Sequence, residues 1–186
     1  EALNDGIPVI RPSTQSLLRV LLRICKPGHI LEIGTATGFS ALLMCEYGPE
    51  DVHITTIEKY AKRIPKARGN FIRFGKESQI TLIEGDAADI LPGLKDKYDW
   101  IFMDAAKGQY IRFLPECMRL LTQGGLLISD NILQGGDVIE SRYAVERRDR
   151  TIHARMREYV YELTHNEALT SCILTDGDGV GLSVRN

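Results

Sequence analysis

Short apolar runs of strand length alternate with longer segments of helical period along most of this chain. Five such runs are each followed by a turn or polar residues and then by a helical pattern: His29–Ile33, His53–Glu58, Gln79–Glu84, Trp100–Asp104 and Leu126–Ser129. This order is typical of an α/β domain built on a mainly parallel sheet. The sequence therefore predicts a doubly wound α/β fold.

The segment before the first run predicts a helix that covers one face of the sheet. It begins at Pro12 and Ser13 and stops at Pro27 and Gly28. Its apolar residues recur at three- and four-residue spacing: Leu17, Leu18, Leu21, Leu22 and Cys25.

After the fifth run, the regular alternation of strand-length runs and helical segments changes. A glycine-rich loop at 134–136 leads to an arginine-rich helix predicted over roughly Val145–Thr164. Two apolar runs follow, Leu169–Thr175 and Val180–Val184, and the Asp-Gly pairs between them indicate a hairpin. One late strand should therefore run antiparallel in an otherwise parallel sheet of seven strands.

Length and charge fit one domain over residues 1–186. The chain is 44% hydrophobic and has 23 Lys+Arg against 25 Asp+Glu, so only a local basic patch could recruit nucleic acid. No apolar run is long enough to span a membrane. Four widely spaced cysteines in apolar stretches predict reduced core thiols and a cytoplasmic setting: Cys25, Cys45, Cys117 and Cys172. Because the chain opens at Glu1 without Met, we also expect a preceding segment.

A glycine-bearing turn follows the first strand and predicts a cofactor site. Gly34 and Gly38 let the backbone approach a ligand, and the next helix offers free N–H groups there. A dinucleotide site would prefer G-x-G-x-x-G, but Ala36 stands at its second glycine. S-adenosylmethionine, which carries no phosphate, needs only the looser pattern.

Two further strand ends can complete this cofactor site. Glu58 ends the second strand, where a carboxylate can accept hydrogen bonds from both hydroxyls of a ribose. Asp86 and Ala87 follow the third strand and can bracket an adenine. A solvated glutamate at a strand end is the alternative interpretation of Glu58.

Oxygen ligands gather after the fourth and fifth strands. Asp104, Asp130 and Asn131 should converge at neighbouring strand ends, and a set made only of oxygens suits Mg²⁺. Lys107 lies three residues beyond Asp104 and can act as a base there, because an ammonium beside a divalent cation loses its proton readily. Alternatively, Asp104 caps a helix, Lys107 is a solvated surface side chain, and Asp130-Asn131 makes a turn.

With these residues in place, the chain resembles the cation-dependent class I O-methyltransferases, which include the catechol and caffeoyl-coenzyme A O-methyltransferases. The matching stretches span nearly the whole chain: Leu31–Ser40, Thr56–Glu58, Gly85–Ala87, Phe102–Tyr110, Gly124–Leu133 and Asp176–Gly179. The resemblance implies a Rossmann-like fold, S-adenosylmethionine as methyl donor, and Mg²⁺ or another divalent cation. A homodimer is the default for such compact enzymes.

The resemblance also implies roles for single residues. Ile10 and Ser40 would approach the methionine part of the cofactor, Glu58 its ribose, and Asp86 and Ala87 its adenine. Gly34 would also belong to the cofactor site. Asp104, Asp130 and Asn131 would hold the metal. Asp104 would also lie beside the cofactor, and Lys107 and Asp104 would be catalytic.

Within the family, the stretch from Asp104 to Tyr110 and the arginine-rich helix look most like the bacterial tRNA 5-hydroxyuridine methyltransferases. Arginine clusters pair with phosphates, and we expect tRNA to be held by this group: Arg142, Arg147, Arg148, Arg150, Arg155 and Arg157. Tyr143, Tyr159 and Tyr161 could stack a splayed base. Gly135 and Gly136 make the loop that follows Asn131 at the edge of the predicted site smaller than in many relatives.

The expected reaction is methylation of 5-hydroxyuridine at the tRNA wobble position to 5-methoxyuridine. Two alternatives stay open. One is an enzyme acting on a small catechol-like or caffeoyl-coenzyme A-like acceptor, for which the arginines form an ordinary charged helix face. The other is a non-catalytic or NAD-binding domain, against which Ala36 and the metal set argue.

Overall fold

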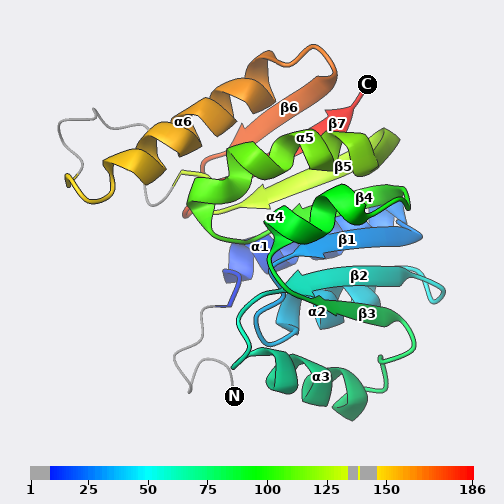
Figure 1. The fold of residues 1–186 in the computed structure, drawn as a ribbon. Coiled ribbons are helices and arrows are strands. Elements are labelled where there is room, and N and C mark those ends of the chain that lie inside the picture. Colours follow the sequence, from blue (N-terminus) through cyan, green and yellow to red (C-terminus); the bar gives the residue numbers. More distant parts are fainter. Residues whose placement is uncertain (1–8, 134–137, 139–145) are drawn as a thin grey trace.

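The computed structural model describes residues 9–133, 138 and 146–186 and contains one seven-stranded sheet (Figure 1). Its strand order is β3-β2-β1-β4-β5-β7-β6. The strands are β1 His29–Ile33, β2 His53–Glu58, β3 Ile80–Glu84, β4 Tyr98–Met103, β5 Leu121–Asp130, β6 Leu169–Leu174 and β7 Val180–Arg185. β7 runs antiparallel to both of its neighbours, β5 and β6, and the other four strand pairs are parallel. The predicted mostly parallel sheet with one antiparallel strand is confirmed.

Helices cover both faces of this sheet, as a doubly wound fold requires (Figure 1). One face carries α1 Pro12–Cys25, α2 Phe39–Tyr47 and α3 Ile64–Arg73, and the other carries α4 Ala87–Ile90, α5 Tyr110–Leu120 and α6 Arg150–His165. Short 3-10 turns lie at Leu91–Gly93 and Lys107–Gln109. Within the described ranges, no helix is long and apolar enough to cross a membrane.

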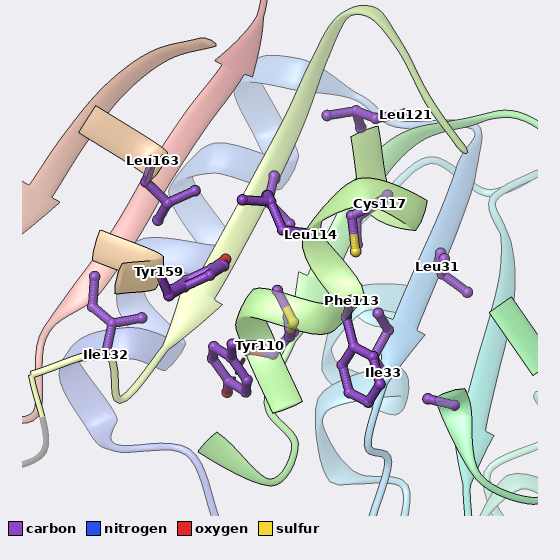
Figure 2. Packing of buried hydrophobic residues seen from close by; sticks show 14 of the residues in the cluster. Leu31, Ile33, Tyr110, Phe113, Leu114, Cys117, Leu121, Ile132, Tyr159 and Leu163 are labelled. Atoms are coloured by element: carbon purple, nitrogen blue, oxygen red, sulfur yellow. Dashed lines mark hydrogen bonds between the residues drawn. The ribbon is translucent and has the colours of Figure 1, made fainter. Parts of the chain in front are cut away.

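Alternate side chains of the central strand feed two separate cores. Trp100 and Phe102 of β4 pack among the helices α1 to α3, whereas Ile101 and Met103 pack among α4 to α6. Figure 2 shows part of the second core, where the rings of Tyr110 and Tyr159 meet edge to face with centroids 5.4 Å apart. Both faces of the sheet are therefore buried, which explains why its strands read as continuous apolar runs.

Several predicted boundaries were wrong by a few residues. β5 begins at Leu121, not Leu126, because its pairing with β4 shifts register between Tyr98 and Trp100 and takes in Gly124, at φ +75°. α6 begins at Arg150, not Val145, and ends at His165. The fourth strand ends at Met103, which places Asp104 just beyond the sheet.

The four cysteines are free thiols, and only two of them are in the core. Cys45 and Cys117 are buried, as predicted, but Cys25 and Cys172 are exposed. Cys25 is the last residue of α1 and Cys172 lies on the edge strand β6, so neither is covered by a second layer. The prediction that all four are core thiols was wrong.

Candidate active site

A cleft of about 720 Å³ lies at the carboxyl ends of the parallel strands. Loops that follow β1, β2, β3 and β4 line it, and the residue before α1 closes one side. The structure brings every predicted cofactor position to this cleft: Ile10, Gly34, Ser40, Glu58, Asp86, Ala87 and Asp104. The identity of the ligand stays a prediction, whereas the structure shows that these residues share one cleft.

The turn after β1 depends on its glycines. Gly34 has φ +96°, and a Cβ there would lie 2.3 Å from the carbonyl oxygen of Asp104. Gly38 has φ +88°, and a Cβ there would lie 2.4 Å from the ring of Phe71. The first glycine therefore lets the loop after β1 touch the strand end that carries Asp104, so two predicted sites share one wall.

Glu58 ends β2 and is 7% exposed, which excludes the solvated alternative. Its Oε2 accepts a 2.8 Å hydrogen bond from the backbone N–H of Ala36, and its Oε1 accepts one of 2.7 Å from that of Tyr60. Each oxygen keeps a further lone pair. Glu58 thus fixes the loop after β1 and can still accept from a ligand in the cleft.

Asp86 lies in the loop after β3 and caps α4. Its Oδ1 accepts from the backbone N–H of Ala88 at 3.0 Å, and its Oδ2 lies 3.2 Å from Lys59 Nζ. The backbone hydrogen bond, more than the lysine, lowers the pKa of Asp86. Ala87, the next residue, is buried and offers an apolar surface beside this carboxylate.

Glu32 is a site residue that the sequence reasoning missed. It is fully buried in β1, where it accepts hydrogen bonds from the hydroxyls of Ser40 and Thr56. Burial raises its pKa above the ordinary value. A signal was available, because an acidic residue in the middle of an apolar strand is costly unless it is paired. Through Ser40, Glu32 shapes the floor of the cleft.

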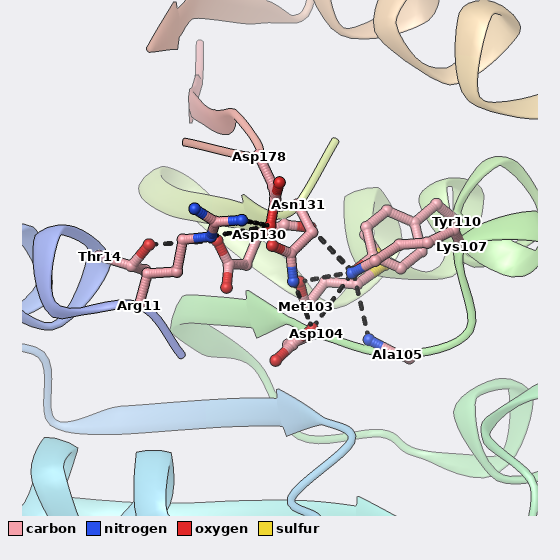
Figure 3. A network of polar contacts seen from close by, with 10 residues as sticks. All are labelled: Arg11, Thr14, Met103, Asp104, Ala105, Lys107, Tyr110, Asp130, Asn131 and Asp178. Atoms are coloured by element: carbon pink, nitrogen blue, oxygen red, sulfur yellow. Dashed lines mark hydrogen bonds and ion pairs between the residues drawn. The ribbon is translucent and has the colours of Figure 1, made fainter. Parts of the chain in front are cut away.

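The predicted metal ligands converge as expected at the ends of β4 and β5 (Figure 3). Asp104 and Asn131 line the cleft, and Asn131 Nδ2 lies 3.5 Å from Asp104 Oδ1. Asp130 does not line it, since this residue is only 3% exposed. Asn131 takes φ +57°, which an asparagine tolerates better than most residues.

The chemistry of this set fits a hard divalent cation. Asp130 Oδ1 accepts from Thr14 at 3.3 Å, but its buried Oδ2 has no hydrogen-bond partner among the described residues. Burial, and secondarily the charge of Asp104, raises the pKa of Asp130 to about 6. In the described ranges, no three His, Cys, Asp or Glu side chains form a metal-ligand group by themselves. The Asn131 amide is therefore needed as the third donor.

Lys107 points into the same group of atoms (Figure 3). Its Nζ lies 3.1 Å from Asp104 Oδ1, 2.8 Å from the hydroxyl oxygen of Tyr110 and 3.1 Å from the carbonyl oxygen of Asp130. The amine is thus held beside the proposed metal position rather than solvated. The alternative in which Lys107 is a surface side chain does not describe this structure.

Comparison with known proteins identifies the family. The model of a family described as O-methyltransferase matches residues 7–186. The chain belongs to the O-methyltransferase family.

Similar proteins that carry a name are also O-methyltransferases. A catechol O-methyltransferase of Niastella koreensis is 33% identical over 141 residues, which cover 73% of this chain and 64% of that relative. A Staphylococcus aureus structure assigned as a caffeoyl-CoA O-methyltransferase superposes with a TM-score of 0.92 at 33% identity, covering 100% of this chain and 88% of that one. An SAH-bound methyltransferase from Podospora anserina gives 0.85 at 26% identity, covering 96% and 80%.

The arginine-rich helix of this O-methyltransferase is partly committed to internal contacts. Arg155 donates to the Gly108 carbonyl at 3.2 Å, and Arg157 donates to the Val138 carbonyl at 3.4 Å. Arg148 pairs with Glu146 at 3.0 Å and is highly exposed. Arg147 is also exposed and Arg150 half-buried, while Arg142 lies outside the described residues. The helix thus abuts the turn that carries Lys107, while Arg147 and Arg148 face solvent in the turn that precedes the helix.

Of the three predicted stacking aromatics, the structure contradicts Tyr159. Tyr159 is fully buried and its hydroxyl lies 2.5 Å from Ser129 Oγ, so it cannot stack a base and that prediction was wrong. Tyr161 is exposed but already stacks on His165, with centroids 3.9 Å apart. Tyr143, like the loop at 134–136, lies outside the described residues.

Proposed function

We propose that this O-methyltransferase moves the methyl group of S-adenosylmethionine to a hydroxyl oxygen, with the help of a divalent cation such as Mg²⁺. One observation carries the proposal above all others. Asp130 Oδ2 is buried without a hydrogen-bond partner among the described residues, and Asp130 directly precedes Asn131, whose Nδ2 lies 3.5 Å from Asp104 Oδ1. The carbonyl of Asp104 in turn lies against the loop at Gly34. Cation and methyl donor would therefore occupy adjoining parts of one cleft.

The methyl donor is inferred from the walls of the cleft. Glu58 offers two oxygens to ribose hydroxyls, and Asp86 and Ala87 stand where an adenine would lie. Ser40 donates its proton to Glu32, so its lone pairs are free to accept from the ammonium of the methionine part. The SAH-bound Podospora relative supports this assignment. Ala36, at φ +50°, argues against a pyrophosphate.

Asp104, Asp130 and Asn131 would hold the cation. When bound, such a cation acts as a Lewis acid that favours the ionised form of a nearby hydroxyl. Tight placement is the contribution of the protein, because donor and acceptor must meet in line and close together. The contact between Gly34 and Asp104 fixes this placement across the cleft.

Lys107 would complete the reaction as the acceptor of a proton. With a cation bound at these ligands, the Lys107 amine would take the proton of the acceptor hydroxyl and become an ammonium, which Asp104 Oδ1, 3.1 Å away, would stabilise. The oxygen then forms a bond to the methyl carbon as the sulfur–carbon bond breaks. The products are a methyl ether and S-adenosylhomocysteine, and the positive charge of the sulfonium is lost in the transfer.

For the acceptor, we propose 5-hydroxyuridine at the tRNA wobble position, which would become 5-methoxyuridine. The support is the place of α6. Arg155 ties this helix to Gly108, next to Lys107, and the exposed Arg147 and Arg148 lie in the turn just before the helix begins at Arg150. Phosphate contacts from such residues would position an anticodon loop.

A small catechol-like or caffeoyl-CoA-like acceptor is the second candidate. It is favoured by the names of two relatives that are each 33% identical to this chain. Both candidates carry a hydroxyl beside a second oxygen atom, so the same oxygen-donor site serves either one. The arginines alone distinguish them.

Parallel methylation assays with each acceptor decide between them. The purified protein is incubated with labelled S-adenosylmethionine and Mg²⁺, together with either hydroxylated tRNA or a catechol. We expect label in tRNA, and nucleoside mass spectrometry of a deletion strain should show 5-hydroxyuridine in place of 5-methoxyuridine. A preference for the free catechol at low salt, with an unchanged nucleoside profile, would establish the small-molecule function instead.

A further inference from the structure

Tyr110 is a buried polar residue to which the proposed reaction gives no role. It is the first residue of α5 and is fully buried. Its side chain reaches between the ends of β4 and β5, into the group of residues around Lys107 (Figure 3). A polar group in this position needs partners, and those of Tyr110 are unusually specific.

The Tyr110 hydroxyl meets four polar atoms. It accepts hydrogen bonds from Lys107 Nζ at 2.8 Å and from the backbone N–H of Ala105 at 3.2 Å. It also lies 3.1 Å from each of two carbonyl oxygens, those of Met103 and Asp130, and can donate its one proton to either.

These contacts lie next to every proposed metal ligand. Met103 is the last residue of β4 and directly precedes Asp104. Asp130 is the last residue of β5 and directly precedes Asn131. One hydroxyl therefore joins the backbone of both strand ends, and it holds the amine of Lys107 as well. Outer-shell hydrogen bonds of this kind set the orientation of metal ligands.

Tyr159 provides a natural comparison within the same core. It is also fully buried, and its ring packs against that of Tyr110 at an interplanar angle of 79°. Its hydroxyl lies 2.5 Å from Ser129 Oγ, so it contacts a side chain of β5 rather than the backbone at a strand end. The two tyrosines thus share burial and packing but differ in what their hydroxyls hold.

We propose that Tyr110 is a positioning residue that fixes the separation of Asp104 from Asp130 and Asn131, orients Lys107, and thereby sets the affinity of the site for its divalent cation. This inference rests on the proposed function, because it presupposes a cation at these residues. Without the hydroxyl, the two strand ends lose their shared partner, and Lys107 keeps only its contacts with Asp104 and Asp130.

Calorimetric titration of Mn²⁺ into metal-free protein tests this role without any turnover. We expect Tyr110→Phe to weaken Mn²⁺ binding by about ten- to a hundredfold, the usual effect of losing an outer-shell partner. Tyr159→Phe should lower the melting temperature to a similar degree but leave Mn²⁺ affinity unchanged. Affinity for S-adenosylhomocysteine should be unchanged in both variants. Unaltered Mn²⁺ affinity in Tyr110→Phe, or an equal loss in Tyr159→Phe, would overturn the inference.

The wild-type protein separates this inference from the proposed function. If wild type binds no Mn²⁺, the metal site itself is wrong and the role of Tyr110 falls with it. If wild type binds and Tyr110→Phe binds equally well, only the role of Tyr110 is wrong. Should Tyr110→Phe not fold, wild-type protein carrying ¹³C at tyrosine Cζ replaces it. Mg²⁺ should then shift the Tyr110 signal and leave Tyr159 in place, and an unmoved Tyr110 signal would reject the inference.

Discussion

The hydroxyl of Thr14 donates a 3.3 Å hydrogen bond to Asp130 Oδ1, across 116 positions of sequence. The bond joins α1 to the end of β5 and occupies one oxygen of a buried carboxylate. The other oxygen, Oδ2, has no hydrogen-bond partner in the described part of the chain. A buried carboxylate that is half satisfied is costly, and a cation at Oδ2 would remove that cost.

Asp130→Asn should separate activity from stability. We expect kcat/KM with Mg²⁺ to fall about a hundredfold or more, because a Lewis-acid contribution of several kcal/mol would be lost. The metal-free variant should be at least as stable as wild type at pH 7, since burial raises the pKa of Asp130 to about 6 and the variant carries no buried charge. Near-normal turnover, with an unchanged circular dichroism spectrum, would reject Asp130 as a metal ligand.

Gly34→Ala should damage the contact between the two halves of the cleft. The new Cβ would lie 2.3 Å from the Asp104 carbonyl at a backbone angle that favours glycine, so we expect a loss of about 2 kcal/mol or more in unfolding free energy. Gly69→Ala is the control, because Gly69 lies inside α3 with open space around it and should gain about 0.5–1 kcal/mol. Equal stabilities of the two variants in urea unfolding would contradict the described contact.

The pH dependence of stability should reveal Glu32. Burial raises its pKa above the ordinary value of 4.5, so the folded state holds this proton more tightly than the unfolded state. Its contribution is therefore favourable at low pH, and the free energy of unfolding should fall as pH rises above 4.5. Glu32→Gln should remove that fall, whereas the exposed Glu50→Gln should keep it. If the free energy of unfolding varied with pH in the same way for wild type and Glu32→Gln, the pKa of the Glu32 carboxyl would not be raised.

Reversing two arginines should separate tRNA binding from cofactor binding. Arg147→Glu combined with Arg148→Glu removes exposed positive charge in the turn just before α6, and we expect tRNA methylation to be abolished while affinity for S-adenosylmethionine stays unchanged. The wild-type rate on tRNA should fall on the order of a hundredfold between about 50 and 200 mM salt, because phosphate contacts release counterions. Normal methylation of hydroxylated tRNA by the double variant would favour the small-molecule acceptor.

The sheet and the rim of the cleft could be predicted because they follow from local patterns. Glu58, Asp104 and Asn131 each follow an apolar run, and the ends of parallel strands share one edge. The burial of Tyr159 was also accessible, since it belongs to a helical stripe with His153, Met156 and Leu163. Its interpretation as a base-stacking residue overlooked that stripe.

Long-range contacts account for what the sequence reasoning missed. Nothing local to Asp130 indicates that Thr14 binds one of its oxygens, or that the residue is buried instead of lining the cleft. The four partners of the Tyr110 hydroxyl likewise depend on how α5 packs between two strand ends. The start of β5 was missed because the glycines at 124–125 resemble a turn although they belong to a bulged strand.

The proposed mechanism requires that methyl transfer depend on a cation held by Asp104, Asp130 and Asn131. Its most direct test measures methyl transfer to the preferred acceptor before EDTA, with EDTA, and after excess Mg²⁺ is returned, with binding of S-adenosylhomocysteine followed in parallel. We expect EDTA to abolish turnover and Mg²⁺ to restore it, while S-adenosylhomocysteine stays bound throughout. Turnover that persists undiminished in EDTA would contradict the proposed mechanism.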